Sequence, residues 1–271
     1  MVGLHCGPNG STELIEVQAG TVGILPGVVH TRALGPGVAV VRRDAGHRIY
    51  MFGGRNVSTD LASCEFVDVM GEKFQCKWTI VDACMAVARI NTCAVLLDHA
   101  TIVICGGQCL AGDTFLSCEL FDLTTHTFSP FPDMLEPRAG HAGVHYMGTI
   151  VIIGGITTKK SCEQFDPAIG KWSPFAPLNV DRPQAGADVV ENKIYVVGGN
   201  NFAIEVYNGS AWSVIATMTP CYSPRAVVCL GKNVGVIAKS DRIDVYCPCT
   251  DTWRKIKLPT LCRPYFLCVS F

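Results

Sequence analysis

Six arginines recur along the chain, each a few residues ahead of an apolar run, and they are the first candidates for binding chemistry. They are Arg32, Arg89, Arg138, Arg182, Arg225 and Arg263. A guanidinium group offers a planar fork of N–H donors to a carboxylate, and each charge-assisted bond contributes about 1.5 to 3 kcal/mol. Several such groups on one face would bind an acidic segment of another protein. The alternative for each is internal, either a hydrogen bond to a loop carbonyl or an ion pair with a neighbouring unit.

Two histidines have a spacing that suits a metal site. His141 and His145 are four residues apart on an expected strand, so their side chains share one face. No acidic or cysteine residue stands beside them, and the remaining histidines are scattered over different parts of the chain. A phosphate-binding loop and a nucleophile elbow are also missing. We therefore predict that the protein is not an enzyme and that it has no catalytic residue, metal site or cofactor.

The 15 cysteines indicate the compartment better than they indicate a site. Many lie in apolar, strand-like segments, as Cys105 and Cys229 do, which is typical of small buried hydrophobic residues in a reducing environment. Cys247 and Cys249 flank a proline but lack a second ligand pair, which argues against structural zinc. The first residues show no secretory signal, and no apolar run approaches the roughly 18 residues of a membrane helix. We expect a cytoplasmic protein that could also be nuclear.

The composition is that of a strand-rich protein. Hydrophobic residues make up 49% of the 271 residues, charged residues only 17%, and there are 27 glycines. This balance favours strands that are mostly interior. The formal net charge of −1 provides no overall field for nucleic acid. Length alone allows one large all-β domain or two small ones.

A repeated motif decides between these possibilities. The stretch from Thr149 to Gly155 is an apolar run closed by two glycines, which suits a strand buried on both faces and ended by residues that tolerate positive φ. The second glycine of each copy falls at Gly54, Gly107, Gly155 and Gly199, which are 53, 48 and 44 residues apart. Degenerate copies lie at 2–7 and 234–239. Six units of about 40 to 50 residues therefore repeat along the chain.

Further markers recur once per unit. Behind each glycine pair an acidic residue opens the next strand, and an aromatic residue usually follows in the strand after that. The acidic residues are Glu16, Glu65, Glu119, Glu163, Glu205 and Asp244. Each unit then has four antiparallel strands, which form a sheet with two apolar faces. Six such sheets bury those faces by stacking radially in a six-bladed β-propeller.

The two ends of the chain contain complementary parts of one repeat unit. Residues 1–25 contain the second, third and fourth strands of a unit, whereas 263–271 contain a lone first strand. We predict that the C-terminal strand joins the N-terminal strands, closes the ring and removes an exposed sheet edge. Residues 1–271 would then form a single domain, which we expect to be monomeric.

The order of arginine, Gly-Gly, acidic-x-aromatic-Asp/Asn and tryptophan resembles the kelch repeat over essentially the whole chain. The best copy contains Arg138, the glycine pair that ends at Gly155, Phe165 and Trp172. The resemblance is to the kelch domain of BTB-kelch adaptors of ubiquitin ligases, without a BTB or BACK segment. In those adaptors, arginines at equivalent strand starts receive acidic side chains of peptides.

The resemblance implies a protein-interaction module and, more specifically, a role like that of the substrate-recognition part of a ubiquitin-ligase adaptor. We expect it to bind a partner peptide or loop, acidic if the arginines make the contact, and neither nucleic acid nor membrane. Loops after the glycine pairs would frame the same face as the six arginines. They add five candidate partner-binding residues: Arg55, Gln108, Lys159, Asn200 and Phe202. Two alternatives stay open: an enzyme similar to kelch-type sialic acid mutarotases, with its site in the channel mouth, and a scaffold for actin or a complex.

Overall fold

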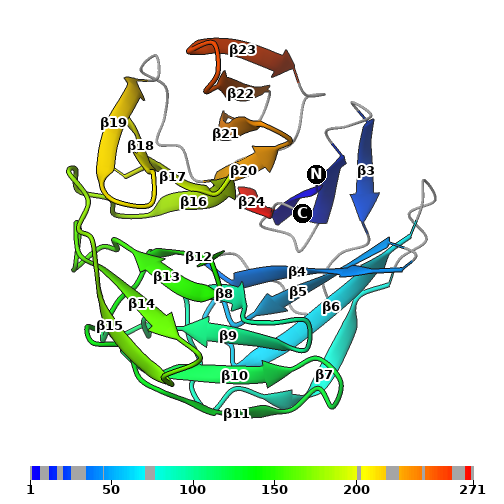
Figure 1. Ribbon diagram of the computed structural model, residues 1–271. Helices are drawn as coiled ribbons and strands as arrows, with labels where there is room; N and C mark the ends of the chain where they lie inside the picture. The colour runs from blue at the N-terminus through cyan, green and yellow to red at the C-terminus, as the bar shows by residue number, and fades with distance from the viewer. Residues whose placement is uncertain are drawn as a thin grey trace.

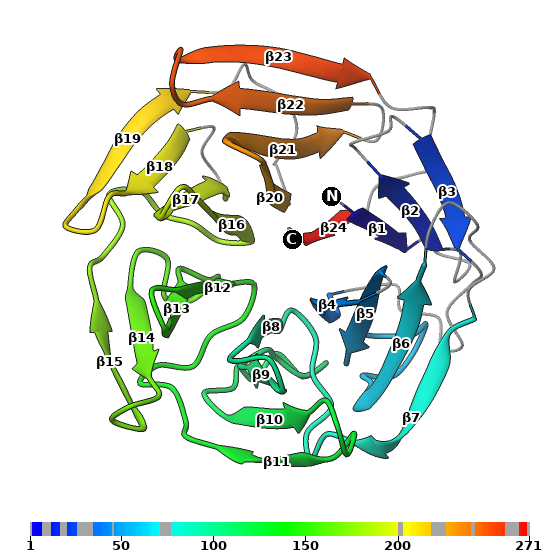
Figure 2. The same ribbon diagram turned by 45° about the vertical axis from the view of Figure 1, so that its right-hand side comes forward.

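The computed structural model describes residues 2–6, 12–16, 21–25, 35–44, 46–70, 77–199, 203–217, 226–239, 242–257 and 266–269. These residues form four-stranded antiparallel sheets arranged radially around a central axis (Figure 1). In each sheet one strand lies nearest the axis and the others follow outwards (Figure 2). Within the described ranges, no helix has the length and apolar character needed to span a membrane.

Five of the sheets are blades made of four consecutive strands, with the first strand innermost. Their strands are β4 (Gly37–Arg43), β5 (Gly46–Phe52), β6 (Ser63–Val69) and β7 (Thr79–Cys84); β8 (Cys93–Leu96), β9 (Thr101–Cys105), β10 (Cys118–Asp122) and β11 (Phe128–Phe131); β12 (Ala142–Tyr146), β13 (Thr149–Ile153), β14 (Cys162–Asp166) and β15 (Lys171–Phe175); β16 (Ala185–Val190), β17 (Lys193–Gly198), β18 (Ala203–Tyr207) and β19 (Trp212–Thr217); and β20 (Ala226–Leu230), β21 (Asn233–Lys239), β22 (Arg242–Cys247) and β23 (Thr252–Lys257).

The remaining four strands come from the two ends of the chain. They are β1 (Val2–Cys6), β2 (Thr12–Glu16), β3 (Thr21–Leu25) and β24 (Phe266–Val269). β24 pairs antiparallel with β1, so the sheet has the order β24-β1-β2-β3, and β24 contacts both β20 and β4.

The expectation of six blades therefore needs a correction. Five sheets are blades of four consecutive strands, and the two chain ends supply a separate sheet that stands beside them, whose side chains lie outside what the structure describes. The predicted closing strand, 263–271, contains β24 (Phe266–Val269), and its other residues lie outside the described ranges. The sequence predicted that this composite sheet is equivalent to the others because the degenerate motif at 2–7 fits the spacing of the repeats.

The hydrophobic core lies between neighbouring blades, as the alternation along β13 shows. Val151 and Ile153 pack in a cluster with residues of β16 and β17 on one side. Ile150 and Ile152 pack in a cluster with residues of β8 and β9 on the other. All four side chains are fully buried. Because successive side chains of a strand point to opposite faces, one short apolar run fills two inter-blade cores.

The glycine pairs end the second strands in backbone conformations that favour glycine. Gly106 has φ of +58° and Gly107 has φ of +101°. A Cβ atom at Gly106 would lie 2.4 Å from the backbone oxygen of Arg138, which belongs to the start of the next blade. The pair therefore combines positive φ with close approach of a neighbouring chain segment, as the motif predicts.

Candidate protein-interaction face

The antiparallel strands place their connections on two opposite faces. One face, which we call the loop face, carries the starts of the first strands, the loops after the second strands and the linkers between blades. Its described segments are 53–62, 85–92, 106–117, 132–141, 154–161 and 176–184. The other, which we call the turn face, carries the tight turns between first and second strands and between third and fourth strands.

Arg138 shows what the recurring arginine does at the loop face. Its side chain is 1% exposed, and its Nε donates to Glu163 Oε1 at 2.6 Å. Its Nη1 donates to the backbone oxygens of Gly154 and Ser161 at 2.9 and 2.8 Å. Glu163 also accepts a hydrogen bond from the backbone N–H of Leu135 at 2.6 Å. The pair thus ties the linker before the blade to the loop inside it.

Arg89 and Arg182 repeat this arrangement. Arg89 Nη2 donates to Glu119 at 2.8 Å, and Arg182 Nη2 donates to Glu205 at 3.0 Å. Each arginine also donates to the carbonyl oxygen of the first glycine in its own blade. Burial lowers the pKa of Arg182, and the charge and hydrogen bond of Glu205 act in the opposite direction. Two markers that the sequence presents separately, the arginine and the acidic residue, are therefore partners within one blade.

The backbone of each arginine joins its blade to the preceding one. Gly54 N–H donates to Arg89 O at 2.8 Å, and Gly107 N–H donates to Arg138 O at the same distance. Gly155 N–H donates to Arg182 O at 3.2 Å in the same way. Since the side chain holds one blade and the carbonyl oxygen holds its neighbour, the arginine and the glycine pair form a repeated clamp between blades.

These contacts bear on how three of the predicted arginines act. The guanidinium groups of Arg89, Arg138 and Arg182 have essentially no exposed surface and are bonded to buried carboxylates and carbonyls. Their placement favours the internal role that the sequence left open over direct contact with a partner. Arg32, Arg225, Arg263, Asn200 and Phe202 lie outside the described residues.

The remaining predicted residues lie on the loop face with some surface available. Arg55 Nε is paired with Asp60 at 2.7 Å. Gln108 exchanges two backbone hydrogen bonds with Ile90. The side chain of Lys159 is 62% exposed and lies 3.8 Å from Asp181. The described part of this face therefore carries some positive charge but no exposed ring of arginines.

Exposed apolar side chains are the feature of the loop face that the sequence analysis missed. They are Val57, Leu110, Leu116, Leu135 and Ile156, between 38% and 92% exposed. Isolated exposed apolar residues are ordinary, whereas apolar residues that gather on one face are typical of interaction surfaces. The available signal was the presence of large apolar residues in the loops after glycine pairs and in a linker between blades, where exposed segments usually carry polar residues.

Hydrogen bonds connect these loops and linkers to one another. Leu110 N–H donates to Asp60, which also pairs with Arg55. Met134 N–H donates to Leu116 O, beside Leu135. Farther along the face, Ile156 N–H donates to the carbonyl oxygen of Ala139 at 2.9 Å. The segments that carry the apolar side chains are therefore connected by hydrogen bonds from backbone N–H groups.

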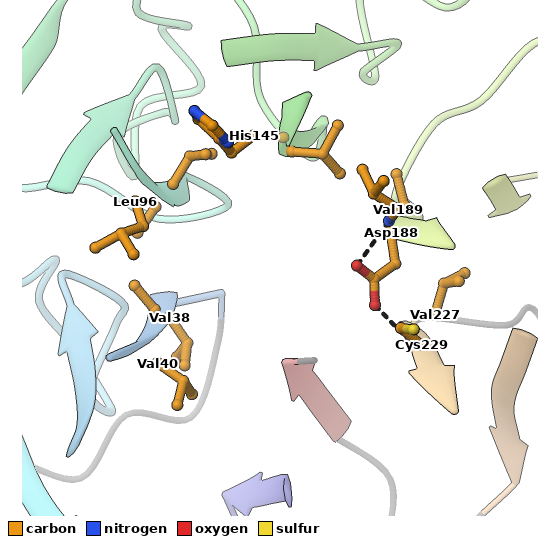
Figure 3. Close-up of a pocket in the computed structure, with 14 residues that line it drawn as sticks. Val38, Val40, Leu96, His145, Asp188, Val189, Val227 and Cys229 are labelled. Carbon is orange, nitrogen blue, oxygen red and sulfur yellow. Dashed lines mark hydrogen bonds between the residues drawn. The ribbon is translucent and has the colours of Figure 1, made fainter. Parts of the chain in front are cut away.

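The axis of the propeller contains a channel of about 360 Å³ lined by β4, β8, β12, β16 and β20 (Figure 3). Its wall is largely valine and alanine, with His145 and Asp188 among the few titratable groups. The Asp188 carboxylate accepts hydrogen bonds from Val189 N–H and Cys229 N–H at 2.7 and 2.5 Å. Burial and the charge of Asp188 raise the pKa of the Cys229 thiol. The channel is large enough for a small molecule, but its carboxylate is already engaged with the backbone.

The two histidines of the suggested metal pair differ in surroundings. His141 is buried beside Gly106, whereas His145 is exposed to the channel. In the part of the chain that the structure describes, neither ring nitrogen of His141 has a hydrogen-bond partner. No cluster of three or more potential metal ligands occurs among those residues either.

The radial sheets and the repeated clamp define a β-propeller built from kelch-like units. The chain is 24% identical over 194 residues to human Kelch-like protein 23, an overlap covering 67% of this chain and 33% of that protein. It is 31% identical over 146 residues to spermatocyte protein spe-26 of Caenorhabditis elegans, covering 46% of this chain and 26% of that one. It is 30% identical over 125 residues to beta-scruin of Limulus polyphemus, covering 42% and 14%.

These relatives confirm the resemblance to kelch-repeat proteins that the sequence motifs predict. No family model matches the chain. The chain spans a third or less of the length of each of these relatives. Together, the fold and the relatives support the class of protein-interaction modules.

Proposed function

We propose that the protein binds a segment of a partner protein on its loop face, with apolar side chains providing most of the affinity. The observation that carries this proposal is the set of five exposed apolar residues on loops that are hydrogen-bonded to one another. Large apolar side chains held on a rigid scaffold are suited to form the centre of an interface. The buried arginines support this surface by fixing the loops rather than by touching the partner.

An acidic character of the partner fits the charges that the loop face exposes. Lys159 and Lys160 are both exposed next to Ile156. A partner segment with apolar side chains and a neighbouring carboxylate would use both features. Because the lysines are exposed, their contribution is weakened by salt. We expect high salt to reduce binding only partly, since apolar burial is not screened.

The finer role we propose is substrate recognition for a ubiquitin ligase in the cytoplasm. This step rests on the resemblance to BTB-kelch adaptors, and on the similarity to Kelch-like protein 23. Ten of the cysteines in the described ranges are free thiols, which fits a reducing compartment. Co-purification of a cullin with the full-length protein from its own cells would support the adaptor role. Partners without any ligase subunit would favour a scaffold.

Substitutions on the two faces test the proposed binding surface. We expect Leu110→Asp combined with Leu135→Asp to reduce the recovery of specific partners by tenfold or more, since losing a central apolar contact costs about 2 kcal/mol or more. The control combines Met147→Asp with Ile169→Asp, which are 76% and 69% exposed on the turn face. The measurement is quantitative mass spectrometry of proteins purified with each variant.

All four substitutions replace exposed side chains, so stability should change little. Equal thermal melting of the two variants and the wild type would verify that. If the loop-face variant kept all its partners while the turn-face variant lost them, the assignment of the binding face would be wrong. If neither variant lost any partner, the described apolar residues would not be the binding surface.

A further inference from the structure

The turn between β22 and β23 brings two thiols into contact on the turn face, away from the proposed binding surface. Cys247 ends β22, Cys249 follows one residue after Pro248, and their Sγ atoms are 2.9 Å apart. Cys249 is exposed and Cys247 is partly exposed. Small molecules in solution can therefore reach both sulfur atoms.

The turn holds this arrangement through its own hydrogen bonds. Tyr246 Oη donates to Asp251 Oδ1 at 2.8 Å, and the hydroxyl groups of Thr250 and Thr252 are 2.7 Å apart. Cys247 pairs with Thr252 at the start of the next strand. Because both ends of the turn are fixed by the strand ladder, the two sulfurs stay close without any further cross-link.

The contact also changes the acidity of the two thiols. The hydrogen bond with Cys249, and then those with the side chain and backbone of Thr250, lower the pKa of Cys247 to about 7. The neighbouring Cys247 raises the pKa of Cys249. The thiolate is the reactive form of cysteine, and an attacking thiol is most effective when its pKa is near the ambient pH. Cys247 is thus the attacking group and Cys249 the second thiol.

We propose that Cys247 and Cys249 form a site of reversible thiol–disulfide exchange with small disulfides of the glutathione type. The Cys247 thiolate attacks one sulfur of glutathione disulfide, the bond between the two glutathione sulfurs breaks, and one glutathione leaves as a thiolate. Cys249 loses its proton and attacks Cys247 Sγ, so the mixed disulfide breaks and the second glutathione leaves. The two protons of the protein thiols end on the two glutathiones. The protein pair is oxidised by two electrons and glutathione disulfide is reduced.

Other described cysteines lack this combination. Cys84 is exposed, but its partner in the strand ladder is Ser63 rather than a thiol. Cys93 and Cys105 are opposite each other on neighbouring strands, but Cys105 is fully buried in the core between two blades. Cys84 is therefore a matched control: an exposed thiol on an outer strand without a second thiol in contact.

Mass spectrometry of the reduced, full-length protein treated with glutathione disulfide tests this inference. Trypsin releases 243–254 with Cys247 and Cys249 as its only cysteines, and 78–89 with Cys84 alone. After free thiols are blocked with N-ethylmaleimide, we expect 243–254 to carry no maleimide and to be about 2 Da lighter than the unmodified dithiol peptide, because of an internal disulfide. We expect this to form about tenfold faster than any glutathione adduct at Cys84.

The variant Cys249→Ser separates the two steps. It should accumulate one glutathione on Cys247, because the thiol that resolves the mixed disulfide is gone. The variant Cys247→Ser should react no faster than Cys84. The inference is overturned if 243–254 keeps two free thiols while Cys84 reacts, or if the wild-type peptide carries two glutathiones in place of an internal disulfide.

Discussion

Replacing Arg138 with alanine is expected to lower the free energy of unfolding by about 3 to 5 kcal/mol, because it leaves a buried carboxylate without its partner. Glu163 is 1% exposed, and the carbonyl oxygens of Gly154 and Ser161 would also lose a donor. Urea titration of the wild type and the variant measures the change. An exposed pair, Lys232 with Glu191, provides the control, since Lys232→Ala should change stability little.

A double-mutant cycle makes this prediction specific to the clamp. Arg138→Met with Glu163→Met removes both charges, so the double variant should be clearly more stable than the sum of the single losses predicts. A double variant whose loss equals that sum would show that the two residues do not act as a pair. An Arg138→Ala variant with wild-type stability would mean that the arginine is not a structural clamp.

Gly106→Ala is expected to be strongly destabilising. The new Cβ atom would lie 2.4 Å from Arg138 O, in a backbone conformation with φ of +58°. The unfavourable conformation alone costs on the order of 1 kcal/mol, and displacing the next blade adds to it, for a total of about 3 kcal/mol. The shift in the urea midpoint measures this loss.

Gly170 is a matched control for the conformational part of that loss. It has φ of +70° in a turn, and a Cβ atom there would have no neighbour within 4 Å. Gly170→Ala should therefore cost only the conformational part, on the order of 1 kcal/mol. Equal losses for the two variants would contradict the claim that the glycine pair is required by the approach of the next blade.

The repeat and its strands could be predicted from the sequence because they depend on local patterns. The apolar run of β13 and the glycine pairs are short-range signals of period two and positive φ, and they placed the strands correctly. The pairing of the C-terminal strand with the N-terminal strands was also predicted from the two chain ends, but the prediction that this sheet is a sixth equivalent blade was wrong.

The roles of the arginines were harder to predict because they depend on contacts between distant residues. Arg138 and Glu163 are 25 positions apart and both are periodic markers, so periodicity alone left the arginine either exposed or paired. Only the strand register shows that the carboxylate faces the linker. The exposed apolar residues were missed for a related reason, since their loops have no period from which burial can be inferred.

Hydrogen–deuterium exchange of the full-length protein with and without a purified partner tests the central claim most directly. We predict that binding slows amide exchange in the loop-face segments 55–60, 108–117, 133–140 and 156–161, and leaves the turns at 147–148, 167–170 and 248–251 unchanged. Slower exchange confined to those turns, or to the strands that line the channel, would contradict the account.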